Sequence, residues 1–119
     1  MCNVLVIDDE HMICDLLKQA LSRINFNVDT ANNAMGGIAK FDKGHYDLVI
    51  TDMRMPGVDG RTIVHHIRNS NRDTTPVIGL SGTPWLLHNG GFDEVLFKPF
   101  ALQSLLDKVT ALTKMPLAG

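Results

Sequence analysis

Acidic side chains follow two short apolar runs of this sequence, and a lysine follows a third. The three junctions are Val4 to Ile7 before Asp8, Asp9 and Glu10; Leu48 to Thr51 before Asp52; and Val95 to Phe97 before Lys98. Short apolar runs rich in β-branched residues are typical of strands buried on both faces of a parallel sheet. Ligands bind beyond the carboxyl ends of such strands. The pattern therefore predicts one small site at which carboxylates and an ammonium group meet.

Carboxylates held this close together need protons or a cation. Like charges about 4 Å apart repel by roughly 4 kcal/mol at an effective dielectric constant of 20. Mg²⁺ suits such a site, because it binds hard carboxylate oxygens and keeps water positions open for a phosphate. Lys98 adds a compact positive charge and Ser81 adds a hydroxyl at the same edge. A carboxylate is also a nucleophile toward phosphorus, so the residues indicate a phospho-acceptor site.

Strand and helix patterns alternate five times, which predicts an α/β fold with a parallel sheet and helices on both faces. The expected strands are Asn3 to Asp8, Asn27 to Ala31, Asp47 to Asp52, Pro76 to Leu80, and Glu94 to Lys98. The first expected helix ends at about Ile24, and the second runs from a cap at Asn32 or Asn33 to Lys43. The other helices are expected from Arg61 to Asn69, from Pro84 to just before Gly90, and from Leu102 to Thr113. The second strand alternates polar and apolar residues, which favours a sheet edge.

The composition and charge of the chain limit the classes of function that it can have. The 119 residues carry 45% hydrophobic and 20% charged side chains, as expected for one globular domain. A net charge of −2 gives no general attraction to nucleic acid or to an acidic membrane, and no apolar stretch reaches bilayer length. Two cysteines make no disulfide framework, which favours a reduced, cytoplasmic protein. We expect a domain over residues 1–114 and a tail over 115–119.

Four segments, taken together and in this order, resemble the receiver domains of response regulators in two-component signalling. The segments are VLVIDDE, DLVITDMRMPGVDG, PVIGLSG and LFKPF. The resemblance covers nearly the whole chain. It implies a (βα)5 flavodoxin-like fold, a doubly wound parallel five-stranded sheet with strand order 2-1-3-4-5.

The resemblance also implies a role for each candidate residue. Those residues are Asp52 as the phosphorylated side chain, Asp8 and Asp9 as the acidic pair that holds Mg²⁺, the backbone carbonyl of Arg54 as a further metal ligand, Ser81 as the switch hydroxyl, and Lys98 as the lysine typical of the family. The Lys98-Pro99 bond is cis in relatives.

The function that follows is that of a switch and not of a metabolic enzyme. Asp52 is expected to take a phosphoryl group from a histidine kinase or a phosphotransfer protein, in a Mg²⁺-dependent reaction. Phosphorylation would then change contacts with a downstream protein or an output domain, and a phosphorylation-dependent homodimer is among the alternatives. No contact with nucleic acid or membrane is expected from this domain itself.

Two features depart from the family pattern. Ser81 and Lys98 lie closer in the sequence than is usual, which implies a shortened fourth helix after Pro84. Val95 stands where relatives often carry an aromatic switch residue. One hypothesis is that a loop over residues 83–91 carries the signal, with Trp85 as a contact. The alternative is that Trp85 only fills the core.

Two other functions compete with the phospho-accepting switch. Phosphohydrolases of the haloacid dehalogenase type also form an aspartyl phosphate, but they place a second Asp two positions after the nucleophile, where this chain has Arg54. A degenerate receiver would be an interaction module that is never phosphorylated. The acidic pair and Lys98 oppose that interpretation, whereas Val95 and the short helix keep it open.

Overall fold

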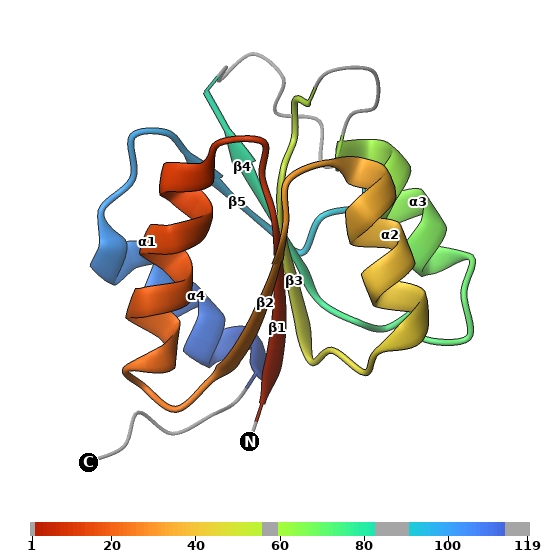
Figure 1. Cartoon of the computed structure of the whole chain (residues 1–119), viewed down its shortest axis with the longest axis horizontal. Coiled ribbons are helices and arrows are strands. Elements are labelled where there is room, and N and C mark those ends of the chain that lie inside the picture. Colours follow the sequence, from red (N-terminus) through yellow and green to blue (C-terminus); the bar gives the residue numbers. More distant parts are fainter. Residues whose placement is uncertain (1, 56–59, 83–90, 114–119) are drawn as a thin grey trace.

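The computed structural model consists of one parallel sheet of five strands with helices on both faces (Figure 1). It describes residues 2–55, 60–82 and 91–113. The elements are β1 (Asn3–Ile7), α1 (His11–Ser22), β2 (Asn27–Ala31), α2 (Ala34–Lys43), β3 (Leu48–Asp52), α3 (Gly60–Arg68), β4 (Val77–Ser81), β5 (Glu94–Phe97) and α4 (Leu102–Thr113). The strands lie in the order β2-β1-β3-β4-β5.

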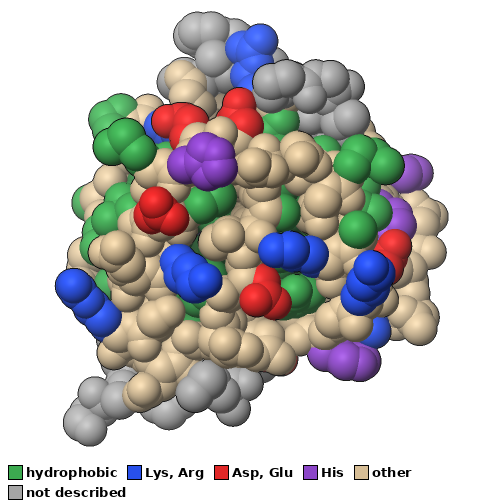
Figure 2. Space-filling model, in the orientation of Figure 1, with side chains coloured by type: hydrophobic (Ala, Val, Ile, Leu, Met, Phe, Trp, Pro, Cys, Tyr) green, Lys and Arg blue, Asp and Glu red, His purple; other side chains and the backbone are tan. Residues whose placement is uncertain are grey.

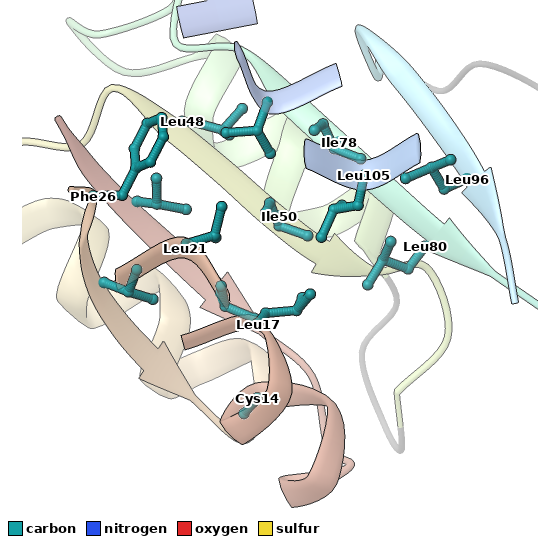
Figure 3. Close-up of a cluster of buried hydrophobic side chains, with 14 residues drawn as sticks. Cys14, Leu17, Leu21, Phe26, Leu48, Ile50, Ile78, Leu80, Leu96 and Leu105 are labelled. Carbon is teal, nitrogen blue, oxygen red and sulfur yellow. The ribbon is translucent and has the colours of Figure 1, made fainter. Parts of the chain in front are cut away.

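The hydrophobic core has two layers, one on each face of the sheet. Helices α1 and α4 cover one face, and α2 and α3 cover the other (Figure 1). In the first layer, Leu17 and Leu21 of α1 and Leu105 of α4 pack against Ile50 and Ile78 of the sheet (Figure 3). Strands β1, β3 and β4 are buried on both faces, which explains why their sequences read as continuous apolar runs.

The register of the sheet aligns the carboxyl ends of its strands. Ile7 of β1 lies opposite Thr51 of β3, and Ser81 of β4 lies opposite Phe97 of β5. The residues that leave these strands, Asp8 and Lys98, therefore enter the same edge as Asp52. The fold thus brings together three segments that are far apart in the sequence.

The expected fold class and strand order are confirmed, as is the place of β2 at a sheet edge. Element ends differ by one or two residues, which is the usual scatter at helix and strand termini. The expected short helix from Pro84, the loop hypothesis that involves Trp85, and the tail over 115–119 lie outside the described residues. None of the helices in the described ranges is both long and apolar enough to cross a membrane.

Two glycines in α2 weaken its helical pattern, and the packing gives a reason for one of them. A Cβ atom on Gly37 would lie 2.4 Å from Cδ1 and 2.7 Å from Cγ1 of Ile7. A glycine at this position therefore lets α2 pack closely on β1. The local loss of helix propensity is offset by this contact with the sheet.

Asn33 caps the amino terminus of α2, as one of the two expected caps. Its Oδ1 accepts a hydrogen bond of 2.6 Å from the backbone N–H of Gly36. The Asn33→Ala substitution should lower the free energy of unfolding by about 1 kcal/mol, because the helix loses a partner for its first N–H groups. Urea denaturation measures this change. Asn32→Ala is the matched control, and an equal loss in both variants would contradict a specific capping role.

Candidate functional site

Asp52 is the last residue of β3 and lies at the centre of the carboxyl edge of the sheet. Its side chain is only 10% exposed. The backbone N–H of Arg54 donates a hydrogen bond of 3.3 Å to Asp52 Oδ1. The other oxygen, Oδ2, lies 3.5 Å from Lys98 Nζ. The carboxylate is thus nearly buried, yet one of its oxygens lies beside a cation.

Asp8 leaves β1 and is completely buried. The backbone N–H of Glu10 donates to Asp8 Oδ1 at 2.9 Å, and Lys98 Nζ donates to Asp8 Oδ2 at 3.1 Å. Behind it, the Cys14 thiol of α1 donates to the Asp8 backbone carbonyl at 3.3 Å. These contacts hold the start of the β1–α1 connection in a single arrangement.

Lys98 follows β5 and joins the acidic groups of two other strands. Its ammonium lies 3.1 Å from Asp8 Oδ2, 3.1 Å from Glu10 Oε1 and 3.5 Å from Asp52 Oδ2. The Lys98 backbone N–H donates to the Ser81 carbonyl at 2.7 Å, which fixes its distance from β4. The Lys98-Pro99 peptide bond is cis, as the resemblance implies.

Burial and the neighbouring charged groups shift the pKa values of Asp52, Asp8 and Lys98. Burial, together with the charge of Asp8, raises the pKa of Asp52 to about 6, against the opposing effect of Lys98. Burial also raises the pKa of Asp8 above its ordinary value, although the Glu10 N–H and Lys98 act to lower it. For Lys98, burial acts to lower the pKa, but its bonds to Asp8 and Glu10 outweigh burial and raise it. Three carboxyl groups thus surround one ammonium group in this site.

The donor set fits a hard divalent cation. Among the described residues, one oxygen each from Asp8, Glu10 and Asp52 forms a group in which all three atoms lie within 4.8 Å of one another. Carboxylate oxygens without nitrogen or sulfur donors suit Mg²⁺ better than a transition metal. Figure 2 shows acidic side chains at the end of the molecule that lies over the carboxyl ends of the strands, and further acidic and basic side chains spread over the same face.

Most of the expected site residues are brought together. Asp8, Asp52 and Lys98 are in contact through the ammonium group, and Ser81 is buried at the end of β4. Arg54 is exposed and approaches Asp52 through its N–H. Asp9 is also exposed and lies outside the three-carboxylate group, although its charge contributes to the raised pKa of Asp52.

Glu10 is the residue whose part in the site the sequence reasoning missed. Its backbone is extended, with φ −90° and ψ 110°. The chain bends at Asp9, and the Glu10 N–H donates to Asp8 Oδ1 across this bend. Glu10 therefore joins Asp8 at the Lys98 ammonium. The apolar run that predicted β1 carries no signal for Glu10, because Glu10 lies beyond the end of that strand and past a bend.

Comparison with known proteins gives a consistent result. The family model described as response regulator receiver domain matches residues 4–110. The chain is 34% identical over 116 residues to transcriptional regulatory protein ResD of Bacillus subtilis, covering 93% of this chain and 48% of that protein. It is 33% identical to transcriptional regulatory protein CusR of Escherichia coli, again over 93% of this chain and 51% of the other. The chain thus spans about half the length of the curated relatives it matches.

Solved structures share the fold over nearly their full length. Response regulator TrrA of Thermotoga maritima, in complex with Mg²⁺-BeF, has a TM-score of 0.86 and 36% identity, covering 94% of this chain and 99% of that one. Chemotaxis protein CheY4 of Vibrio cholerae has a TM-score of 0.86 and 27% identity, covering 94% and 98%.

Proposed function

The chain belongs to the response regulator receiver domain family of two-component signalling, and from that premise we propose that Asp52 is its phospho-acceptor. The observation that carries the proposal is the position of Lys98. Its ammonium lies 3.5 Å from Asp52 Oδ2 and 3.1 Å from Asp8 Oδ2, at the edge of the sheet where a phosphoryl group can approach. The proposed receiver domain spans residues 1–114, with a tail over 115–119.

In the proposed reaction a carboxylate oxygen of Asp52 attacks phosphorus. The bond between phosphorus and the donor nitrogen of a kinase phosphohistidine breaks, an acyl phosphate forms, and the imidazole leaves with its electron pair. Because the pKa of Asp52 is about 6, its carboxylate is ionised and nucleophilic at neutral pH. Lys98 then neutralises part of the charge on the phosphoryl oxygens, and the Ser81 hydroxyl is a donor at the same edge.

Mg²⁺ is part of the proposal. Asp8, Asp9, Asp52 and the Arg54 carbonyl are the ligands implied by the family, and of these Asp8 and Asp52 belong to the described group of neighbouring carboxylates. When bound, the ion would reduce repulsion among the carboxylates and between them and the phosphoryl oxygens. The support is the set of carboxylate oxygens from Asp8 and Asp52 at one site, near a single ammonium group.

Magnesium should therefore stabilise the folded domain. At ten times its dissociation constant, Mg²⁺ should raise the free energy of unfolding by about 1.4 kcal/mol, because it binds the assembled carboxylates and not the unfolded chain. Urea denaturation at constant ionic strength measures the increase, with NaCl as the matched salt. An equal increase with NaCl alone would contradict a specific magnesium site.

The proposed partners follow from the family. The donor would be a histidine kinase or a phosphotransfer protein, and the phosphorylated state would act through a downstream protein or an output domain. A phosphorylation-dependent homodimer is one form of that output. A location in the cytoplasm belongs to the same proposal, since two-component phosphotransfer takes place there.

The experiment that tests the proposed function is intact mass spectrometry after incubation with acetyl phosphate. Wild-type protein should gain one phosphoryl group with Mg²⁺ and none when EDTA is present. Absence of the adduct in a folded protein would favour an interaction module that is never phosphorylated. Turnover of a phosphate ester would favour a phosphohydrolase, which the exposed Arg54 in place of an acid–base carboxylate does not support.

A further inference from the structure

Glu10 is a third carboxylate at the Lys98 ammonium, and it differs from the other two in exposure. The Asp8 side chain is 0% exposed and that of Asp52 is 10% exposed, whereas that of Glu10 is 59% exposed. Its Oε1 nevertheless lies 3.1 Å from Lys98 Nζ, closer than the 3.5 Å between Lys98 and Asp52 Oδ2. The lysine is thus drawn more closely to Asp8 and Glu10 than to the proposed acceptor.

A phosphoryl group on Asp52 would change this balance in two ways. It would add anionic oxygens that compete with Glu10 for the ammonium, which has only three N–H donors. It would also add negative charge beside the Glu10 carboxylate, since oxygens of Glu10 and Asp52 lie within 4.8 Å of each other. Both effects require Glu10 to give up Lys98, or to share it, when the phosphoryl group enters.

We propose that Glu10 is a positioning residue that holds Lys98 in the unphosphorylated site and opposes the entry of a phosphoryl group. The inference rests on the proposed function of Asp52. Asp8 cannot have the same role, because it is buried and fixed by the Glu10 N–H. Glu10, at the solvent edge, has room to turn away. It therefore sets how readily Lys98 leaves its resting position.

The test measures binding of beryllofluoride, an anionic mimic of the phosphoryl group, to wild type, Glu10→Gln and Asp15→Asn. Titration calorimetry at saturating Mg²⁺ gives the beryllofluoride affinity, and a separate titration gives the Mg²⁺ affinity. Asp15→Asn removes the same charge from the exposed face of α1 and serves as the matched control. Urea denaturation verifies that each variant is folded.

We expect Glu10→Gln to bind beryllofluoride at least about threefold more tightly than wild type. This ratio corresponds to the free energy of one surface ion pair, the pair between Glu10 and Lys98 that the variant loses. Asp15→Asn should bind it as wild type does. Unchanged or weaker binding by Glu10→Gln would overturn the inference. A roughly tenfold loss of Mg²⁺ affinity in Glu10→Gln would also overturn it, because Glu10 would then be a metal ligand. If wild type itself binds no beryllofluoride, the proposed function fails and the inference fails with it.

Discussion

The Asp52→Asn variant should gain no phosphoryl group from acetyl phosphate and Mg²⁺, under conditions in which wild type gains one. The amide nitrogen and oxygen of asparagine keep the shape of the side chain but remove its nucleophilic charge. The remaining carboxylates do not replace it. Asp8 is buried with both oxygens bonded, and Asp9 is exposed away from the three-carboxylate group. Intact mass of the two proteins, in the same incubation, measures the loss.

The same substitution should make the metal-free domain more stable at neutral pH. The pKa of Asp52 is about 6 in the folded protein, above the ordinary value near 3.9 in an unfolded chain. The folded state therefore holds the proton more tightly, and wild type loses stability as the pH rises from about 4 through 6. The amide of the variant carries no such charge. At pH 8 in EDTA, Asp52→Asn should exceed wild type by about 2 kcal/mol in free energy of unfolding.

Urea denaturation of both proteins between pH 4 and 8 tests this sign. The difference between them should shrink toward zero near pH 4, where Asp52 is protonated in the folded state and begins to be protonated in the unfolded chain. Titrating groups that do not interact with Asp52 are shared by the two proteins and cancel in the difference. A variant that still gains a phosphoryl group would refute Asp52 as the acceptor. A variant that is less stable at pH 8 would show that ionised Asp52 is favourably paired in the folded state.

Gly60→Ala should lower stability by about 1–3 kcal/mol, the usual range for forcing an extra group into a packed position. A Cβ atom on Gly60 would lie 2.6 Å from the Asp52 backbone oxygen and 2.9 Å from the Met53 Cα, both of which are main-chain atoms. The Gly60 N–H also donates to the Met53 carbonyl at 2.9 Å. Relief of the clash must therefore move the start of α3 or the residue that bears the acceptor carboxylate.

The matched control is Gly82→Ala, because a Cβ atom there would meet no atom of the described residues within 4 Å. We expect Gly82→Ala to change the free energy of unfolding little, and Gly60→Ala also to weaken Mg²⁺ binding, since Asp52 is displaced. Urea denaturation and magnesium titration of the two variants give both results. If Gly60→Ala had the same stability and magnesium affinity as wild type, the start of α3 would have shifted without disturbing β3, and the prediction would be wrong.

The fold was readable from the sequence because its signals are local and agree with one another. Continuous apolar runs at β1, β3 and β4 report burial on both faces, and the alternation in β2 reports a sheet edge. The choice between Asn32 and Asn33 as the helix cap could not be made in this way. It depends on which side chain reaches the Gly36 N–H, and that follows from backbone angles.

The site residues at the ends of strands could be predicted from the sequence. The roles of residues in the connections after the strands were harder to predict. Asp52 and Lys98 lie where the parallel sheet must place them, at the carboxyl edge. Which of Asp8, Asp9 and Glu10 contacts Lys98 depends on the direction of each side chain after β1 ends. Past the bend at Asp9 the Glu10 side chain contacts Lys98, while Asp9 itself is exposed. The charge pattern alone treats the three as equivalent.

The pairing of Asp8 with Lys98 joins residues 90 positions apart. A chain made from its amino terminus therefore contains the carboxylates of the site well before the ribosome adds the lysine that pairs with them. Until β5 takes its place beside β4, Asp8 has no counter-charge from Lys98. β5 thus completes the sheet and the proposed acceptor site together. We therefore expect phosphorylation of Asp52 only after β5 has joined the sheet.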